Sequence, residues 1–86
     1  MPYHIRYHPQ VRERDLRLIP ENMRRRVLIA IGDRLATEPC LYGNRLRKSL
    51  KGFWKLRVGD YRIFFDIHSP VVMIHFIAHR GDAYLI

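Results

Sequence analysis

The sequence has one cysteine and no long hydrophobic run. Cys40 is the sole cysteine among 86 residues, which excludes an internal disulfide framework and a zinc site built from several cysteines. A chain this poor in thiols suits a reducing compartment, and we expect Cys40 to be a small packed residue beside a turn. The sequence shows neither a hydrophobic signal region at its start nor an apolar span long enough for a bilayer. We therefore expect a cytoplasmic protein with no membrane partner.

Internal repeats, low-complexity tracts and linkers are also missing, so residues 1–86 are predicted to form one domain. A domain of this size buries only about 60% of the surface of its unfolded chain. Hydrophobic residues make up 48% of the sequence and aromatic residues 12%, a composition that excludes a disordered chain.

Acidic residues are scarce relative to basic ones. Sixteen Lys and Arg against eight Asp and Glu give a net charge of +8. A basic excess this large on a small body predicts a polyanionic partner, since phosphate contacts release counterions and basic fields speed association. The alternative is a surface charge that serves solubility alone, but the basic residues are interleaved with aromatic ones, which favours a partner.

The second half of the chain has the pattern of three antiparallel strands. Apolar and basic residues alternate from Trp54 to Val58, as in a half-buried strand. Gly59-Asp60 then suits a two-residue type II′ turn that places Val58 opposite Tyr61.

The next strand is predicted over residues 61–67, and His68-Ser69-Pro70 reads as a turn because Pro cannot donate to a strand ladder. Residues 71–78 are apolar at nearly every position, as in a central strand covered on both faces. The aromatic residues Trp54, Phe64, Phe65 and Phe76 are assigned to the core.

The first half predicts a strand and two helices. Residues 3–7 alternate as a strand, and a helix is expected from Pro9 to Ile19. A clearer amphipathic helix follows over residues 21–35, then a loop over 41–44 and a basic extended segment over 45–51.

We therefore expect a two-layer α+β domain of order β-α-α-β-β-β(-β). A helical hairpin would cover one face of a small twisted, antiparallel-rich sheet, and the other face would be available for a ligand. Arg24, Arg25 and Arg26 on the outer face of the second helix would contact RNA, or form a solvated surface or one that an acidic partner grips.

Residue types needed for phosphate chemistry collect on the predicted sheet. They are Lys55, Arg57, Arg62, His79, Arg80 and Tyr84. The other histidines (His4, His8, His68 and His75) lack metal-ligand spacing, so no metal site and no cofactor are expected.

The strings LKGFWKLRVGDYRIFFDI and VVMIHFIAHRGDAYL resemble the RelE/ParE superfamily of toxins from type II toxin–antitoxin modules, with the RelE-like branch favoured. The resemblance extends over nearly the whole chain and implies a twisted sheet packed on a helical hairpin. RelE-like members are ribosome-dependent endoribonucleases that enter the ribosomal A site and cut messenger RNA. ParE-like members act on DNA gyrase and lack the nuclease residues.

By this resemblance, Lys55 lies near the reacting 2′-hydroxyl and phosphate, and Arg62 contacts the scissile phosphate. Arg80 stabilises charge and assists the leaving group, and Tyr84 stacks on the substrate. Arg45, Arg47, Lys48, Lys51 and Arg57 would bind the phosphates of messenger and ribosomal RNA diffusely. The expected protein partner is a small acidic antitoxin.

The general base stays open. RelE has a second lysine where this chain has Phe53, and no carboxylate stands where related toxins pair a Glu with a His. Lys55, if neighbouring cations lower its pKa, and His79 are candidates, although His79 also fits a histidine satisfied by a backbone carbonyl.

The expected reaction is attack of a 2′-hydroxyl on the adjacent phosphate, without metal. A ParE-like gyrase inhibitor and an inactive relative that only binds its antitoxin or RNA are the alternatives.

Overall fold

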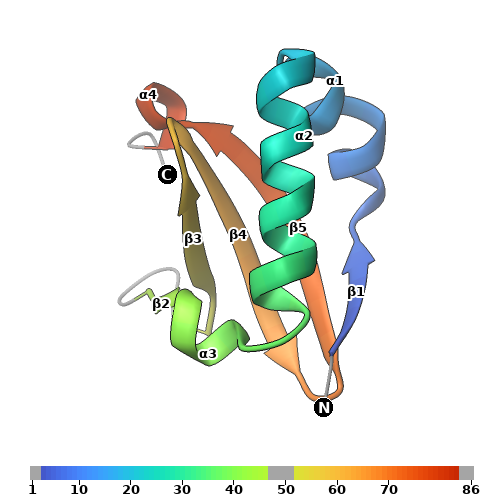
Figure 1. Cartoon of the computed structure of the whole chain (residues 1–86), viewed down its shortest axis with the longest axis vertical. Helices are drawn as coiled ribbons and strands as arrows, with labels where there is room; N and C mark the ends of the chain where they lie inside the picture. The colour runs from blue at the N-terminus through green and yellow to red at the C-terminus, as the bar shows by residue number, and fades with distance from the viewer. Residues whose placement is uncertain (1–2, 47–51, 84–86) are drawn as a thin grey trace.

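The computed structural model describes residues 3–46 and 52–83 of the chain. Five strands form one sheet in the order β1-β5-β4-β3-β2, and the helices lie across one of its faces (Figure 1). The strands are β1 (His4–Tyr7), β2 (Asn44–Arg45), β3 (Trp54–Val58), β4 (Tyr61–His68) and β5 (Val71–His79). The predicted two-layer α+β architecture is confirmed.

The helical layer is a hairpin of two segments. The first contains η1 (Val11–Asp15) and α1 (Leu16–Leu18), and the second contains α2 (Glu21–Ala30) and its continuation η2 (Ile31–Leu35). Both predicted helices are therefore present, and each includes one turn of π-helix. Arg24 Nη1 donates a hydrogen bond of 3.2 Å to the Leu16 carbonyl, so this arginine ties the two segments together.

The register of the sheet follows the alternation in the sequence. Val58 pairs with Tyr61 across the predicted turn, where Gly59 has a φ of 57° that glycine adopts without steric cost. The first strand, β1, pairs in parallel with β5 from His4 opposite Val71 to Tyr7 opposite Ile74, a position that the sequence pattern left open.

A β-bulge interrupts the pairing of β4 with β5. Phe64 pairs with Phe76 and the next residue, Phe65, pairs with Ile74, so His75 is the extra residue of β5. A bulge changes the direction in which nearby side chains point. As a result, residues 75 and 76 do not follow the strict alternation expected from the sequence.

The core lies between the helices and one face of the sheet. Its completely buried members include Val27 and Leu35 from the helices and Ile63, Phe65 and Ile74 from the sheet. At roughly 25 cal/mol per Å² of apolar surface removed from water, burial of these side chains is the main stabilising contribution.

Two of the four aromatic side chains assigned to the core lie on the other face. Phe64 and Phe76 stack there with ring centroids 4.4 Å apart, whereas Phe65 is part of the helix-side core and stacks on Trp54. The prediction that β5 is covered on both faces was wrong, because Val72, Ile74 and Ile77 are buried while the residues between them are half-buried. The cause is that the helices cover only one face.

The segment after the second helix also differs from the prediction. A short helix, α3 (Pro39–Tyr42), occupies part of the expected loop, with Pro39 buried at its first turn. Proline is pre-organised for that position. Cys40 is exposed on α3, so its prediction as a packed residue was wrong.

The outer edge of β5 is completed by a carboxylate. Pairing with β1 stops at Ile74, and the amide of Ile77 instead donates a buried hydrogen bond of 3.0 Å to Asp15 Oδ2. Arg14 Nε lies 3.2 Å from the other oxygen of Asp15. The backbone is thus fixed two residues before His79. Within residues 3–46 and 52–83, no helix is both long and apolar enough to cross a membrane.

Candidate functional site

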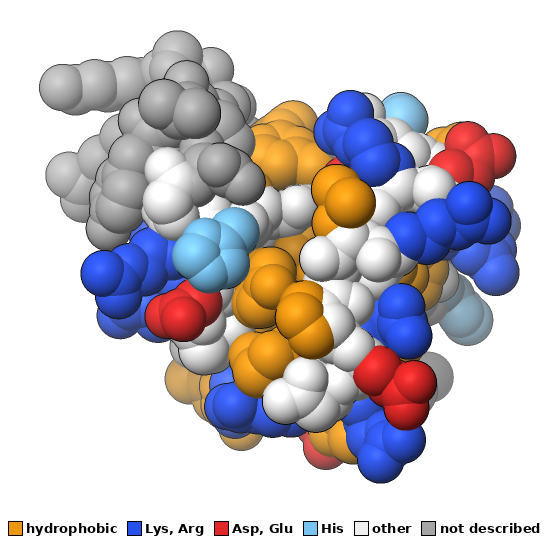
Figure 2. All heavy atoms as spheres, turned by 90° about the horizontal axis from the view of Figure 1, so that it is seen from above, with side chains coloured by type: hydrophobic (Ala, Val, Ile, Leu, Met, Phe, Trp, Pro, Cys, Tyr) orange, Lys and Arg blue, Asp and Glu red, His pale blue; other side chains and the backbone are white. Residues whose placement is uncertain are grey.

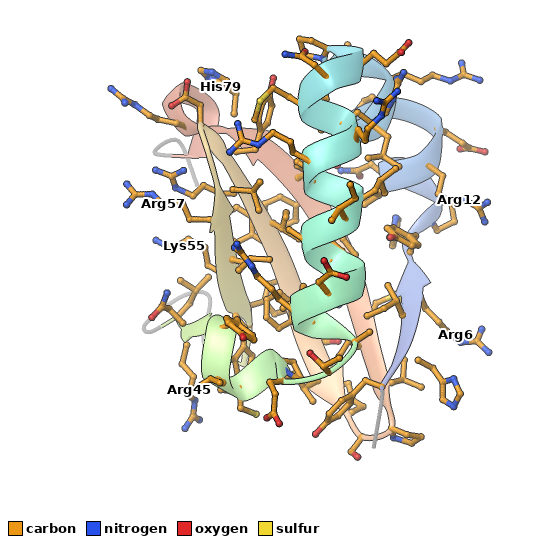
Figure 3. All side chains as sticks on the ribbon, viewed as in Figure 1. Arg6, Arg12, Arg45, Lys55, Arg57 and His79 are labelled. Carbon is orange, nitrogen blue, oxygen red and sulfur yellow. The ribbon has the colours of Figure 1, made fainter. Side chains whose placement is uncertain are left out.

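The sheet face opposite the helices carries three cations from neighbouring strands. Because Leu56 and Val58 are buried towards the helices, Lys55 and Arg57 project from the other face of β3. Arg62 of β4 lies directly opposite Arg57. In Figure 3, Lys55 and Arg57 extend outward beside β3, and Arg45 lies below them near β2.

Arg62 is buried, although the sequence predicted an arginine that contacts phosphate. Its residue is 5% exposed, and its Nη1 lies 3.4 Å from the carbonyl oxygens of Gly59 and Tyr61. The guanidinium therefore supports the β3–β4 turn. Its charge still adds to the positive field beneath the exposed Arg57.

Arg80 lies at the same end of the sheet. It begins α4 (Arg80–Ala83), its amide donates to the Asp60 carbonyl, and its Nη1 is 3.9 Å from Asp60 Oδ1. Its side chain is 63% exposed, so this ion pair is weak and the guanidinium is accessible to an anion.

His79 faces the opposite side of the sheet. It pairs with Tyr61, and the two rings meet edge to face at a centroid distance of 5.3 Å. The Gly81 amide donates to His79 Nδ1 at 3.3 Å, so a backbone amide, not the expected carbonyl, satisfies this nitrogen. The structure does not bring His79 together with Lys55.

Arg45 of β2 packs over the ring of Trp54, with Cζ 5.7 Å from the ring centroid. This cation–π contact holds the Arg45 side chain beside the edge of the sheet. Four other predicted site residues, Arg47, Lys48, Lys51 and Tyr84, lie outside the described residues.

The same open face carries a group of residues whose proximity could not be predicted from their spacing in the sequence. Asp66 lies 2.9 Å from His75 and 3.4 Å from His68, and the ring of Phe53 stacks on His75. Their proximity depends on the bulge at His75, which has no clear signal in the sequence. In the part of the chain that the structure describes, no group of three or more His, Cys, Asp or Glu residues is arranged to hold a metal ion.

A groove of about 610 Å³ opens at the end of the sheet near His79. It lies between the first helical segment and the ends of β4 and β5, where Leu18, Ile19, Tyr61 and Ile77 line it. Figure 2 shows hydrophobic side chains gathered at the centre of this end of the molecule, with Lys and Arg side chains to either side. The surface can accept an amphipathic or anionic partner.

Comparison with known proteins identifies the class. Residues 5–84 match the family described as the ParE toxin of type II toxin–antitoxin systems. Toxin RelG of Mycobacterium tuberculosis is 38% identical, with 98% of each chain covered. Toxin RelE of the same organism is 34% identical, with 96% of this chain and 87% of the relative covered.

The solved structures agree. The RelBE2 toxin–antitoxin complex from M. tuberculosis matches with a TM-score of 0.87 and 32% identity over 95% of each chain. The RelE–RelB complex from Pyrococcus horikoshii matches with a TM-score of 0.74 and 28% identity over 94% of this chain and 98% of that one. The protein therefore belongs to the ParE toxin family, within the RelE/ParE superfamily of type II toxin–antitoxin toxins.

Proposed function

We propose that this toxin cuts messenger RNA on the ribosome by attack of a ribose 2′-hydroxyl on the adjacent phosphate. The products would be a 2′,3′-cyclic phosphate and a 5′-hydroxyl. The observation that carries the proposal is the cationic open face, on which Lys55, Arg57 and Arg62 lie on adjacent strands. The similarity to toxins named RelE and RelG supports the same function.

The reaction builds negative charge on the phosphate, and fixed cations are the groups that stabilise it. Arg80 is accessible at the end of β5, and a guanidinium can bind two phosphate oxygens while keeping its charge. Lys55 would contact the reacting nucleotide. Arg62 would contribute its charge from below the surface, and Tyr84 would stack on a base, an interaction worth roughly 1–3 kcal/mol.

The toxin would act in the cytoplasm, where the ribosome would provide a second surface for it to bind. A net charge of +8 on 86 residues favours association with ribosomal RNA, and the basic residues 45, 47, 48, 51 and 57 would contribute diffuse phosphate contacts.

We also propose a small acidic antitoxin as the cognate partner. Solved structures similar to this chain are toxin–antitoxin complexes, and the helical side of this molecule exposes large apolar residues. Leu41 is 70% exposed and Ile29 55%, and Ile29 lies near the basic residues Arg26 and Arg34. An acidic amphipathic segment would complement this surface in charge and polarity.

The test is to incubate purified protein with messenger RNA, with and without programmed ribosomes, and to map the new 5′ ends. We expect cuts inside translated codons when ribosomes are present, and at least a hundredfold slower cutting by the Lys55→Ala/Arg80→Ala variant. Intact messenger RNA at all protein concentrations would overturn the proposal.

The second candidate function is inhibition of DNA gyrase, because the matching family is described as the ParE toxin. A gyrase supercoiling assay tests it. Inhibition of supercoiling by the wild type, together with intact messenger RNA on ribosomes, would establish a gyrase inhibitor instead.

A further inference from the structure

A carboxylate on the open face lies between two histidines. Asp66 Oδ2 is 2.9 Å from His75 Nε2 and 3.4 Å from His68 Nε2. The Asp66 side chain is 17% exposed, and among the described residues its Oδ1 is buried without a hydrogen-bond partner. The His75 contact has the distance of an ion pair but lacks hydrogen-bond alignment. A buried carboxylate oxygen without a donor costs free energy, so its place on the open face calls for an explanation.

His75 lies on the same face of the sheet as the cationic residues of β3, two strands away. It is the extra residue of the bulge, next to Phe76, whose partner Phe64 pairs in turn with Lys55. Phe53, two residues before Lys55, stacks on the His75 ring with centroids 4.8 Å apart and planes at 18°. The side chain of residue 53, directly before β3, thus reaches residue 75 of β5 across β4. The stack holds the imidazole on the open face of the sheet, the face that also carries Lys55.

We infer that His75, oriented by Asp66, is the general base that takes the proton of the attacking 2′-hydroxyl. The inference rests on the nuclease function proposed above and assigns the one role that the sequence left open. An imidazole exchanges protons near neutral pH. A carboxylate close to one ring nitrogen stabilises the imidazolium that forms.

In the tautomer that carries its proton on Nε2, the atom 2.9 Å from Asp66 Oδ2, His75 uses Nδ1 to accept the 2′-hydroxyl proton as the 2′-oxygen forms its bond to phosphorus. The bond from phosphorus to the 5′-oxygen breaks, and the ammonium of Lys55 protonates that oxygen. Solvent then returns the proton from His75 to Lys55. The products are the 2′,3′-cyclic phosphate and the 5′-hydroxyl.

Three variants test the assignment by the pH dependence of single-turnover cleavage on ribosomes. His75→Gln is expected to slow cleavage at least a hundredfold and to remove the fall in rate at acidic pH. Asp66→Asn is expected to slow cleavage without weakening ribosome binding. His68→Gln is the matched control, because it removes the other histidine near Asp66. The side chain of His68 is 82% exposed, and the cleavage rate of this variant should stay within twofold of the wild type. The titratable and charged groups on the elements packed beside His75 are Asp66 and His68 on β4, Lys55 on β3, Arg6 on β1, which pairs with Met73, and His8, whose amide donates to the Ile74 carbonyl.

Chemical rescue separates catalysis from folding. We expect His75→Ala to regain cleavage in proportion to added free-base imidazole, and not with pyrazole, a ring of similar shape and much weaker basicity. A wild-type rate and pH profile in His75→Gln, an equal loss in His68→Gln, or equal rescue by pyrazole would each overturn the assignment of His75. The absence of ribosome-dependent cuts by the wild type would instead overturn the nuclease function and this inference with it.

Discussion

At the scale of single residues, Arg57 and Arg62 present like charges directly opposite each other on neighbouring strands. Such a pair costs stability in a sheet. Arg62 offsets part of this cost through the carbonyl oxygens of Gly59 and Tyr61, while Arg57 is exposed to solvent. The strand register pairs neither arginine with an acidic residue. A bound phosphate would therefore relieve the repulsion between them. The pair therefore favours an anionic ligand at this place.

Alanine at these two positions should have different effects. Arg57→Ala is expected to reduce cleavage and to leave the free energy of unfolding within about 0.5 kcal/mol of the wild type, as for an exposed residue. Arg62→Ala is expected to reduce cleavage and also to cost about 1–3 kcal/mol, because the turn carbonyls lose their charged donor. Thermal unfolding and cleavage assays on both variants check this. Equal unfolding free energies for the two variants would contradict the role given to Arg62.

Tyr7 should make stability depend on alkaline pH. Burial raises the pKa of Tyr7 above its ordinary value of 10.0, and the Arg12 guanidinium opposes the shift in part. The folded protein therefore holds this proton at a pH where the unfolded chain has lost it. The free energy of unfolding should be unaffected below pH 10 and should fall as pH rises above it. Denaturant titrations from pH 8 to 11.5 should show a smaller fall for Tyr7→Phe, and an identical fall would refute the assignment.

The individual site residues were only partly predictable. Strand alternation and the Gly59-Asp60 turn suffice to place Lys55, Arg57 and Arg62 on one face. The burial of Arg62 depends on the shape of the turn, and the meeting of Asp66 with His75 depends on a bulge. His79 lies on the helix-facing side because of its pairing with Tyr61. These three features depend on how the strands turn and pair, so a local sequence pattern does not reveal them.

At the scale of elements, Asp15 joins the first helical segment to the last long strand. The residue is 6% exposed, and its carboxylate accepts the hydrogen bond of the Ile77 amide, where β1 has ended. Asp15→Ala would leave that amide unsatisfied, at a cost of about 1–3 kcal/mol, and should loosen the strand end that carries His79 and Arg80.

Asp15→Asn retains an acceptor oxygen and should lose less stability and less cleavage than Asp15→Ala. Asp33 is exposed, and Asp33→Ala serves as the control. Its free energy of unfolding is expected to stay within about 0.5 kcal/mol of the wild type. The comparison requires chemical denaturation of the three variants. Equal stability of Asp15→Ala and the wild type would contradict the structural role of this carboxylate.

Two glycines give a matched test of packing between elements. A Cβ at Gly43 would lie 2.6 Å from Phe65 Cζ and 2.9 Å from the Pro39 carbonyl oxygen, so Gly43→Ala should cost about 1–3 kcal/mol through overpacking. A Cβ at Gly32, inside the helix η2, would meet nothing within 4 Å. Gly32→Ala should therefore stabilise by about 0.5–1 kcal/mol. Melting temperatures should move in opposite directions, and a shared direction would contradict this packing.

The elements themselves were largely predictable, because period-2 and period-3.6 patterns describe how one face of a strand or helix is buried. The sequence could not show that β1 pairs in parallel with β5, since that pairing joins residues more than sixty positions apart. The short helix α3 was also missed. Its buried Pro39 starts a helical turn that extends into residues 41–44, for which only a loop was predicted.

At the scale of the whole molecule, the two faces of the sheet have separate tasks. One face packs against the helical hairpin and supplies the core. The other face carries Lys55, Arg57 and the Asp66–His75 pair on a protein of net charge +8. This division lets a small domain with one hydrophobic layer keep charged residues on the opposite face of its sheet. The proposed nuclease uses that surface, and the antitoxin would cover the helical side.

The most direct measurement replaces one ribose in the messenger RNA. A ribosome is programmed with a message that the wild-type toxin cuts at a mapped position, and the nucleotide before the cut is changed to its 2′-deoxy form. The account predicts that cutting at that bond stops while ribosome binding is unchanged, and that the unmodified message gives a 2′,3′-cyclic phosphate end. Continued cutting of the 2′-deoxy message at the same bond would contradict 2′-hydroxyl attack and, with it, the proposed mechanism.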